Sequence, residues 1–516
     1  MKKILIFILL VNFLIFSVEK NLKSKREIKS YTLKDSIYKA LKNNLDLKVE
    51  ITDQEYYFQT LNIQESIFIP KLNINFSMSE RNYPSTGILS GAAINKSKSQ
   101  SLTLSLNQKL ALGGDFSIEF LNTRSESNSR FSTINPAIDS QIKFSFTQPL
   151  LKNFGTFNTK KDIYITINEY KKSEHQLKDK LIDLIYSVEE AYWNLVYAYQ
   201  NLDAQKKALE RARKLLKENE IKVRVGTAAP MDILEAKADV ALYESNVIQA
   251  EKNIESAEDS LKKILNISDK DFKIIPLDKP DIEKIKVNFN DFLLEALNNR
   301  PDIENARLDL ENYKIRVKYQ KNQMLPDLKL SASYYTTGIG GDQLIIKQET
   351  IFGPREIIGV IKKDVWETMK DVFSNLYKNY SIGLNLSIPL SFKKERAELM
   401  QAKINLKKAL YNLKNIENNI LFEVKSVIKE LEANYKLVEA NGIRVELEKQ
   451  KLEAEQKKLA VGLSTNFQVL TYQRQYADAQ TNYLKSVIDY KMTISKINKI
   501  IARTLKVYNI NLNDVK

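Results

Sequence analysis

The sequence contains no cysteine and only one histidine, His175, among its 516 residues. The lack of cysteine excludes disulfide bonds, thiolate zinc sites, iron–sulfur clusters and cysteine nucleophiles. A single histidine excludes a metal site built from several histidines, and no nucleophile-elbow motif accompanies it. No phosphate-binding glycine loop is present either. We therefore expect a protein that is not an enzyme and that has no cofactor and no metal site.

Residues that interrupt helices and strands are also scarce. With 14 glycines and 11 prolines, the chain is expected to form few turns and long continuous elements. Lysine and arginine exceed aspartate and glutamate by 79 to 64, which gives a net charge of +15. These charges are spread along helical stretches rather than gathered beside aromatic residues. The pattern favours solvated helix faces, and nucleic acid is not predicted as a partner.

Residues 1–20 have the composition of a secretory signal peptide. A basic start, Met1–Lys3, precedes the almost wholly apolar run Ile4–Ser17. This run is shorter than a membrane-spanning helix requires, although an uncleaved anchor is the alternative interpretation. No later segment is apolar over 18 residues, so any membrane span of the exported chain must be made of β-strands.

Short motifs of the first half of the chain recur in the second half in the same order. The recurring pairs are Ala40–Asn44 with Ala296–Arg300, Ile69–Leu72 with Leu325–Leu328, Phe146–Leu150 with Leu386–Leu390, and Val225-Gly226 with Val461-Gly462. This order predicts an internal duplication. The predicted parts are a first structural repeat at residues 31–267, an equatorial linker at 268–287, a second repeat at 288–504 and a tail at 505–516.

Apolar residues also recur at steps of seven, a pattern typical of coiled-coil packing. The two series are Leu181, Val188, Leu195, Leu202, Leu209, Leu216 and Val223, and Val424, Leu431, Val438, Val445, Leu452 and Leu459. They predict one long antiparallel helical hairpin at residues 159–265 and another at 393–503. Without internal proline, the first helix of each can extend for roughly 100 Å.

Between the helices, apolar residues alternate with small polar ones, as in Leu72–Met78 and Ile382–Ile388. The alternation predicts strands within 71–148 and 328–389. It is typical of a transmembrane β-barrel with a polar lumen, and a half-buried soluble sheet is the alternative. We expect a short turn at Gly113-Gly114 and long connections at 81–99 and 125–140. Trp366, in an insertion over 338–378, is interpreted as a membrane-interface anchor or as part of a loop core.

Taken together, these motifs resemble the TolC-like outer-membrane efflux protein family over nearly the whole mature chain. The resemblance implies a mainly α fold with β-strands, in which long coiled-coil hairpins form an α-helical barrel and the protomers share one transmembrane β-barrel. It also implies a homotrimer in the outer membrane, with a long periplasmic portion and outer-membrane lipid around the strands. Further implied partners are a periplasmic adaptor protein and an ion-driven or ATP-driven inner-membrane pump. The predicted function is a passive channel-tunnel of a tripartite efflux or secretion system. An exported coiled-coil structural or adhesive protein without a pore is the alternative.

The resemblance directs attention to the two hairpin tips. It implies adaptor contact at Val225, Gly226, Thr227, Val461, Gly462, Leu463 and Ser464. A plain glycine cap that ends each helix is compatible with that role. Four further residues are candidates for a periplasmic constriction: Asp232, Glu235, Gln468 and Thr471. Only the first hairpin supplies carboxylates, so any acidic ring would come from it, and stabilisation of a helix N-terminus is the alternative role.

Overall fold

The computed structural model describes residues 27–85, 93–267, 272–347 and 355–512. The predicted signal peptide lies outside the described residues. Contacts divide the chain into two units, and each unit takes segments from both halves of the sequence. The helical unit comprises residues 1–55, 172–307 and 412–516, and the sheet unit comprises residues 56–171 and 308–411. The fold is mainly α with a β-sheet, as predicted.

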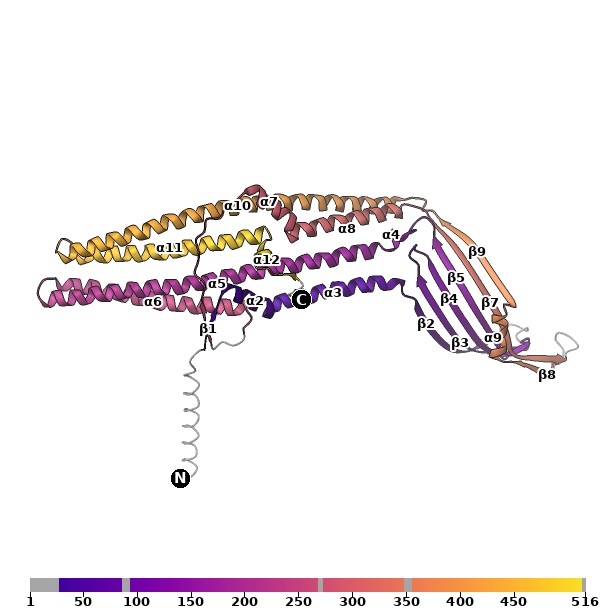
Figure 1. Ribbon diagram of the computed structural model, residues 1–516. Helices are drawn as coiled ribbons and strands as arrows, with labels where there is room; N and C mark the ends of the chain where they lie inside the picture. Colours follow the sequence, from indigo (N-terminus) through magenta and orange to yellow (C-terminus); the bar gives the residue numbers. More distant parts are fainter. Residues whose placement is uncertain (1–26, 86–92, 268–271, 348–354, 513–516) are drawn as a thin grey trace, which may run out of the picture. The chain divides into compact units, whose positions relative to one another are not determined.

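Two long antiparallel hairpins dominate the helical unit (Figure 1). The first consists of α5 (Lys161–Arg224) and α6 (Pro230–Ile264), and the second of α10 (Lys393–Ala460) and α11 (Asn466–Ile500). The helix α5 begins after a separate short helix, α4 (Thr156–Thr159), rather than at residue 159. The helix α11 ends before Ala502, whose φ of +54° is incompatible with a continuing right-handed helix. None of the described helices combines the length and the apolar composition needed to cross a membrane.

In α5 the seven-residue series forms the core over Leu181–Leu195 but not over the whole helix. Leu181, Val188 and Leu195 are fully buried, whereas Leu202, Leu209 and Leu216 are only half-buried. Nearer the tip the buried residues of α5 are instead Ala208, Ala212 and Leu215. A straight helix drifts relative to a strict seven-residue repeat, so the buried stripe moves to neighbouring positions. The prediction of one continuous seven-step seam is therefore wrong for this part of α5.

The helical unit also contains a small parallel sheet that the sequence did not indicate. Strand β1 (Glu27–Tyr31) pairs with β6 (Phe272–Pro276), which lies where only a linker was predicted. The helices α2 (Leu33–Asn43), α7 (Phe289–Asn299) and α12 (Thr504–Val507) belong to the same unit. The two strands lie far apart in the sequence. Each has only five residues, which is too few to show an alternating apolar pattern.

Seven described strands form the antiparallel sheet of the sheet unit (Figure 1). The strands are β2 (Lys71–Pro84), β3 (Ile94–Lys109), β4 (Asp115–Ser127), β5 (Ile134–Pro149), β7 (Asp327–Lys347), β8 (Glu356–Lys363) and β9 (Tyr377–Ser387). Their order is β2-β3-β4-β5-β7, and β7 then pairs with β9 along its first part and with β8 along its last part. The helices α3 (Leu45–Glu65) and α8 (Pro301–Gln323) and the short η1 (Ser66–Phe68) precede strands β2 and β7.

Two sequence predictions about the sheet are corrected. The strands extend into the segments 81–99 and 125–140, so the connections between them are shorter than expected. The insertion at 338–378 contains strand β8 and helix α9 (Val365–Phe373) rather than irregular loop. Apolar alternation could not reveal the outer strand ends, because residues such as Glu80, Lys98 and Arg124 occupy positions that are apolar further along the same strands.

One face of the sheet is apolar, and it is formed by the even-numbered residues. Cross-strand neighbours on this face include Phe76 with Leu102, Leu104 with Phe120, Phe144 with Tyr334, and Leu330 with Leu384. Successive side chains of a strand point to opposite faces, so the odd-numbered Asn73, Asn75 and Asn385 lie on the other face. We call the even-numbered surface the apolar face.

Candidate functional site: the hairpin tips

The first tip is a glycine-terminated helix end. Gly226 has φ +79°, its N–H donates to the carbonyl of Val223 (3.0 Å), and the N–H of Thr227 donates to that of Lys222 (2.8 Å). Together these two bonds are a Schellman motif, which satisfies carbonyl groups left free at the end of α5. Pro230 then begins α6, at a position where its missing N–H costs nothing.

The second tip has a different sequence and the same geometry. Gly462 has φ +78°, its N–H donates to Leu459 (3.3 Å), and the N–H of Leu463 donates to Lys458 (2.9 Å). The Ser464 hydroxyl donates to Glu455 (2.6 Å), and the Thr465 hydroxyl accepts from the N–H of Gln468 (3.3 Å). The glycine-cap interpretation is therefore correct for both tips.

Apolar side chains at both tips are directed to solvent in the protomer. Val225 is 67 % exposed, Val461 70 % and Leu463 78 %. Exposed aliphatic residues beside a rigid, capped turn form a small surface that another protein can cover. The tip residues named from the sequence thus have a backbone fixed by the glycine cap and side chains exposed to solvent.

The four constriction candidates are half-buried, and three of them have local partners. One carboxylate oxygen of Asp232 accepts from the N–H of Ala229 (3.1 Å), which caps the start of α6. Thr471 donates to the Phe467 carbonyl (2.9 Å) within α11, and Gln468 donates its backbone N–H to Thr465. Among the hydrogen bonds and ion pairs of the described residues, none joins Asp232 or Glu235 to Gln468 or Thr471. Glu235 acts electrostatically on Arg474 of α11, so the first hairpin contributes Asp232 and Glu235 and the second Gln468 and Thr471, with no direct bond between the two pairs.

Sequence reasoning missed a polar cluster that joins the two hairpins near their tips. Asp239 of α6 is 1 % exposed, and Arg474 of α11 donates to its Oδ1 from Nε (3.1 Å) and from Nη2. The other carboxylate oxygen of Asp239 and the Tyr243 hydroxyl are buried without a hydrogen-bond partner. The guanidinium of Arg211 lies over the ring of Tyr476, 5.2 Å from its centroid. We call these five residues the inter-hairpin cluster.

The electrostatics of this cluster follow from burial. Burial, reinforced by the neighbouring Asp239 carboxylate, raises the pKa of Tyr243 to about 12. The hydrogen bond to Asp239 raises the pKa of Arg474 above its already high ordinary value. Tyr243 thus stays neutral and Arg474 stays charged at physiological pH. The sequence indicated the burial of Asp239 but not its partner, because Asp239 lies in the same helical stripe as the buried Ala236 and Tyr243.

A second buried carboxylate lies beside the C-terminal segment. Glu189 of α5 is 4 % exposed and accepts a hydrogen bond from the Tyr508 hydroxyl. Burial raises the pKa of Glu189 from 4.5 to about 7, although the hydrogen bonds from Tyr508 and Ser495 act in the opposite direction. Folding therefore favours protonated Glu189 at mildly acidic pH.

This shift predicts a pH-dependent stability. The folded state binds a proton that the unfolded state lacks between pH 4.5 and about 7, so the contribution of Glu189 to stability falls as the pH rises through that window. The whole effect amounts to about 3 kcal/mol. In Glu189→Gln this dependence is expected to vanish. Thermal unfolding of both proteins at about pH 5 and about pH 8 checks it, since other groups titrate alike in both. Parallel pH profiles would contradict the assignment.

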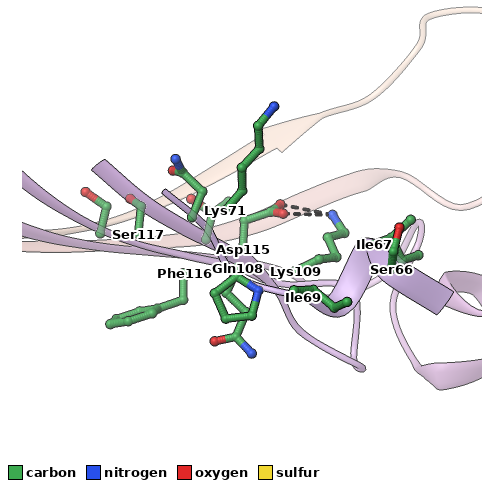
Figure 2. A pocket seen from close by; sticks show the side chains of 13 residues that line it. Ser66, Ile67, Ile69, Lys71, Gln108, Lys109, Asp115, Phe116 and Ser117 are labelled. Atoms are coloured by element: carbon green, nitrogen blue, oxygen red, sulfur yellow. Dashed lines mark hydrogen bonds and ion pairs between the residues drawn. The ribbon is translucent and has the colours of Figure 1, made fainter. Parts of the chain in front are cut away.

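A hollow in the sheet unit lies where η1 meets the sheet. It measures about 690 Å³ and is lined by the ends of β2, β3 and β4. Figure 2 shows Lys109 and Asp115 directed toward each other there, with Nζ–Oδ distances of 3.0 and 3.1 Å. The two groups neutralise each other, and the hollow offers no nucleophile with an adjacent base. In the part of the chain that the structure describes, no three His, Cys, Asp or Glu side chains gather as metal ligands.

The geometry so far defines a class of protein: two long helical hairpins with capped, exposed turns, and an antiparallel sheet with one apolar face. A family model described as outer membrane efflux protein matches residues 120–266 and 293–497, which is more than half of the chain. The chain belongs to this family, and the TolC-like resemblance is confirmed. It is an outer-membrane efflux channel and not an enzyme, and the pore-less adhesin alternative is set aside.

Solved structures share this fold at low sequence identity. The CmeC outer membrane channel of Campylobacter jejuni is 17% identical with a TM-score of 0.64, covering 93% of this chain and 90% of that chain. The MtrE outer membrane channel of Neisseria gonorrhoeae, solved in its open state, is 16% identical with a TM-score of 0.61 and coverages of 91% and 88%. The outer membrane protein VceC of Vibrio cholerae is 16% identical with a TM-score of 0.60 and coverages of 91% and 95%. No curated protein matches the sequence.

Proposed function

We propose that the protein is the passive outer-membrane conduit of a tripartite export system. In this proposal three protomers close one transmembrane β-barrel with their sheets, and their helical hairpins form a periplasmic tunnel. A periplasmic adaptor contacts the tips, and an inner-membrane pump supplies the energy. Each protomer contributes the two repeats, the linker and the tail expected from the sequence. The observation that carries the proposal is the apolar, open-edged sheet.

The edges of the sheet support closure between protomers. Among the described residues, β2 pairs only with β3, and β9 pairs only with β7, so the outer edge of each carries unpaired backbone groups. In lipid each such group costs several kcal/mol, so an open sheet is not a stable membrane structure. Five successive antiparallel pairings make β2 and β9 run in opposite directions. The β9 edge of one protomer can therefore pair antiparallel with β2 of the next.

The side chains of these edge strands are evidence that only one face of the sheet contacts lipid. On the apolar face, Phe76 is 66 % exposed, Ile382 75 % and Leu384 68 % in the protomer. Their neighbours on the other face are Asn75, Ser381 and Asn385. Alternation of this kind places apolar residues toward lipid and polar residues toward a wet lumen.

Cysteine labelling tests the barrel. Because the chain has no cysteine of its own, Asn75→Cys and Phe76→Cys each introduce a single thiol. In reconstituted vesicles a membrane-impermeant maleimide is expected to label the cysteine at Asn75 and to leave the one at Phe76 unlabelled until the protein is denatured. Asn385→Cys and Leu384→Cys form the matched pair on β9. Equal labelling within both pairs would contradict the barrel.

The capped turns support adaptor contact. A Cβ added at Gly226 meets no atom within 4 Å, so a side chain there projects from the tip and strains only the positive φ. That strain costs about 1–2 kcal/mol. We expect Gly226→Trp to reduce export several-fold by covering the contact surface, while trimers still form. Gly226→Asn is the control, since asparagine tolerates this backbone conformation and adds little bulk. Normal export by the tryptophan variant would remove the tip from the adaptor contact.

The acidic residues of the first tip support a weakly cation-selective constriction. In a trimer, Asp232 and Glu235 of each protomer would approach one axis and concentrate cations there. We expect Asp232→Asn combined with Glu235→Gln to lower the cation selectivity of the pore in planar bilayers. The amide at position 232 keeps a hydrogen-bond acceptor for the Ala229 N–H, so the helix cap survives. Unchanged selectivity would leave both residues as helix-start acids only.

A further inference from the structure

Helix α9 lies directly on the backbone of β7 (Figure 1). A Cβ at Gly338 would lie 2.3 Å from the carbonyl oxygen of Thr368, and one at Gly340 would lie 2.0 Å from the Thr368 hydroxyl. The Thr336 hydroxyl donates to the carbonyl of Val372 (3.1 Å). Only glycine permits so close an approach of helix and strand. The helix is therefore fixed to the sheet along the side that carries Thr368 and Val372, both of which are buried.

The contact lies on the apolar face of the sheet. Tyr334, Thr336, Gly338 and Gly340 are alternate residues of β7, so they share a face with Leu328, Leu330 and Ala332. Tyr334 also donates a hydrogen bond to Asn375, just beyond the end of α9. Helix α9 thus covers the same surface that the proposed barrel turns toward lipid.

Along strand β4, polar residues enter the apolar face at the level of α9. Below it, Ile142 of β5 faces Phe120 of β4. At the level of Gly338, Ser140 is 1 % exposed and accepts a hydrogen bond from Asn122 (2.7 Å). One step further along the same face, Arg124 of β4 pairs with the apolar Ile138 of β5. The helix therefore lies where polar residues first enter the apolar band, on β4 and at Ser140 of β5.

The opposite side of α9 is aromatic and exposed. Trp366 is 77 % exposed and Phe373 71 %, and the exposed Lys370 lies between them. Positions 366, 370 and 373 are spaced by four and three residues, so they share one side of the helix. Leu376 and Tyr380, exposed at 60 % and 78 %, continue this surface onto β9.

We propose that α9 is an interfacial helix that inserts Trp366 and Phe373 into the outer leaflet, at the boundary between acyl chains and headgroups. The inference rests on the proposed function, in which the apolar face meets lipid, and the exposed Leu376 and Tyr380 link α9 to that face on β9. Tryptophan is enriched at this depth of a bilayer. The Lys370 stem can lie along the apolar boundary while its ammonium group reaches the headgroups. The occupant is thus lipid, rather than a second copy or another protein.

Tryptophan fluorescence tests the proposal in the full-length protein. The chain has two tryptophans, and Trp193 lies buried in α5 of the helical unit. Trp193→Phe therefore leaves Trp366 as the only emitter. In vesicles of dioleoylphosphatidylcholine, replacing part of the lipid with chain-brominated phosphatidylcholine is expected to quench most of the Trp366 emission, while aqueous iodide quenches it little. The matched Trp366→Phe protein, which emits from Trp193, is expected to show no lipid quenching.

A third variant separates this proposal from the barrel itself. Leu384→Trp, in a chain lacking Trp193 and Trp366, places the emitter on the apolar face of β9. Lipid quenching at position 384 without quenching at Trp366 would overturn the interfacial helix and leave the channel proposal standing. Two other results would also overturn the interfacial helix: quenching of Trp366 by iodide alone, or no quenching by either agent because protein covers Trp366. Absence of lipid quenching at both positions would overturn the barrel as well.

Discussion

Replacing Val438 with aspartate is expected to destabilise the helical unit by several kcal/mol. Val438 is 4 % exposed and packs in the core with Leu431, Val487 and Tyr490. An aspartate there would be buried without a partner, and burying an unpaired charge is among the most destabilising single changes. Far-UV circular dichroism during chemical unfolding measures the loss.

Lys436→Asp is the matched control, because it introduces the same group two residues away at an exposed position. It should change the free energy of unfolding by less than about 1 kcal/mol. Leu202→Asp should fall between the two, since Leu202 is half-buried. Equal tolerance of all three would contradict the assignment of the core.

Arg474→Ala is expected to cost about 3 kcal/mol, because it leaves the carboxylate of Asp239 buried and unpaired. Asp239 is 1 % exposed on its side chain, and Arg474 is 50 % exposed, so water offsets part of the loss. Asp239→Ala combined with Arg474→Ala should cost less than Arg474→Ala alone, since the pair is then removed together.

A double-mutant cycle measured by unfolding gives this coupling directly. Limited proteolysis near the tips supplies a second readout, because separated hairpins expose more backbone to protease. Additive effects of the two single changes would show that the ion pair does not connect the hairpins. The Arg211–Tyr476 contact would then be the stronger link in the cluster.

Features set by local chemistry were predictable from the sequence. The scarcity of proline and the seven-residue series were sufficient to indicate the long hairpins. A single glycine at each turn indicated the helix caps at Gly226 and Gly462, because positive φ is a local requirement. The apolar alternation likewise located the inner part of β2, β3, β4, β5, β7 and β9, where the two faces have a distinct chemistry, but not β1, β6 or β8.

Features that depend on partners far apart in the chain were not predictable. Asp239 and Arg474 are separated by 235 residues, and no period relates them. The outer halves of the strands are polar on both faces, so they look like loops. Helix α9 depends on glycines of β7 that make room for it, and their purpose appears only when the two segments are adjacent. The constriction candidates were named from the family resemblance. Their hydrogen bonds within the helix ends, such as that from the Ala229 N–H to Asp232, were not predicted.

The buried carboxylate of Glu189 bears on the order in which the chain can fold. The core around it includes Leu181 and Leu195, and it is completed by Leu505 and Ile510 near the other end of the described chain. Tyr31 and Tyr508 contact α5 from opposite termini. Contacts so distant in sequence form late and slowly. The core around Glu189 is therefore complete only when the segment that carries Leu505 and Ile510 has packed onto α5. A copy truncated before Leu505 would lack part of this core, so it is expected to unfold at a lower temperature than the full chain.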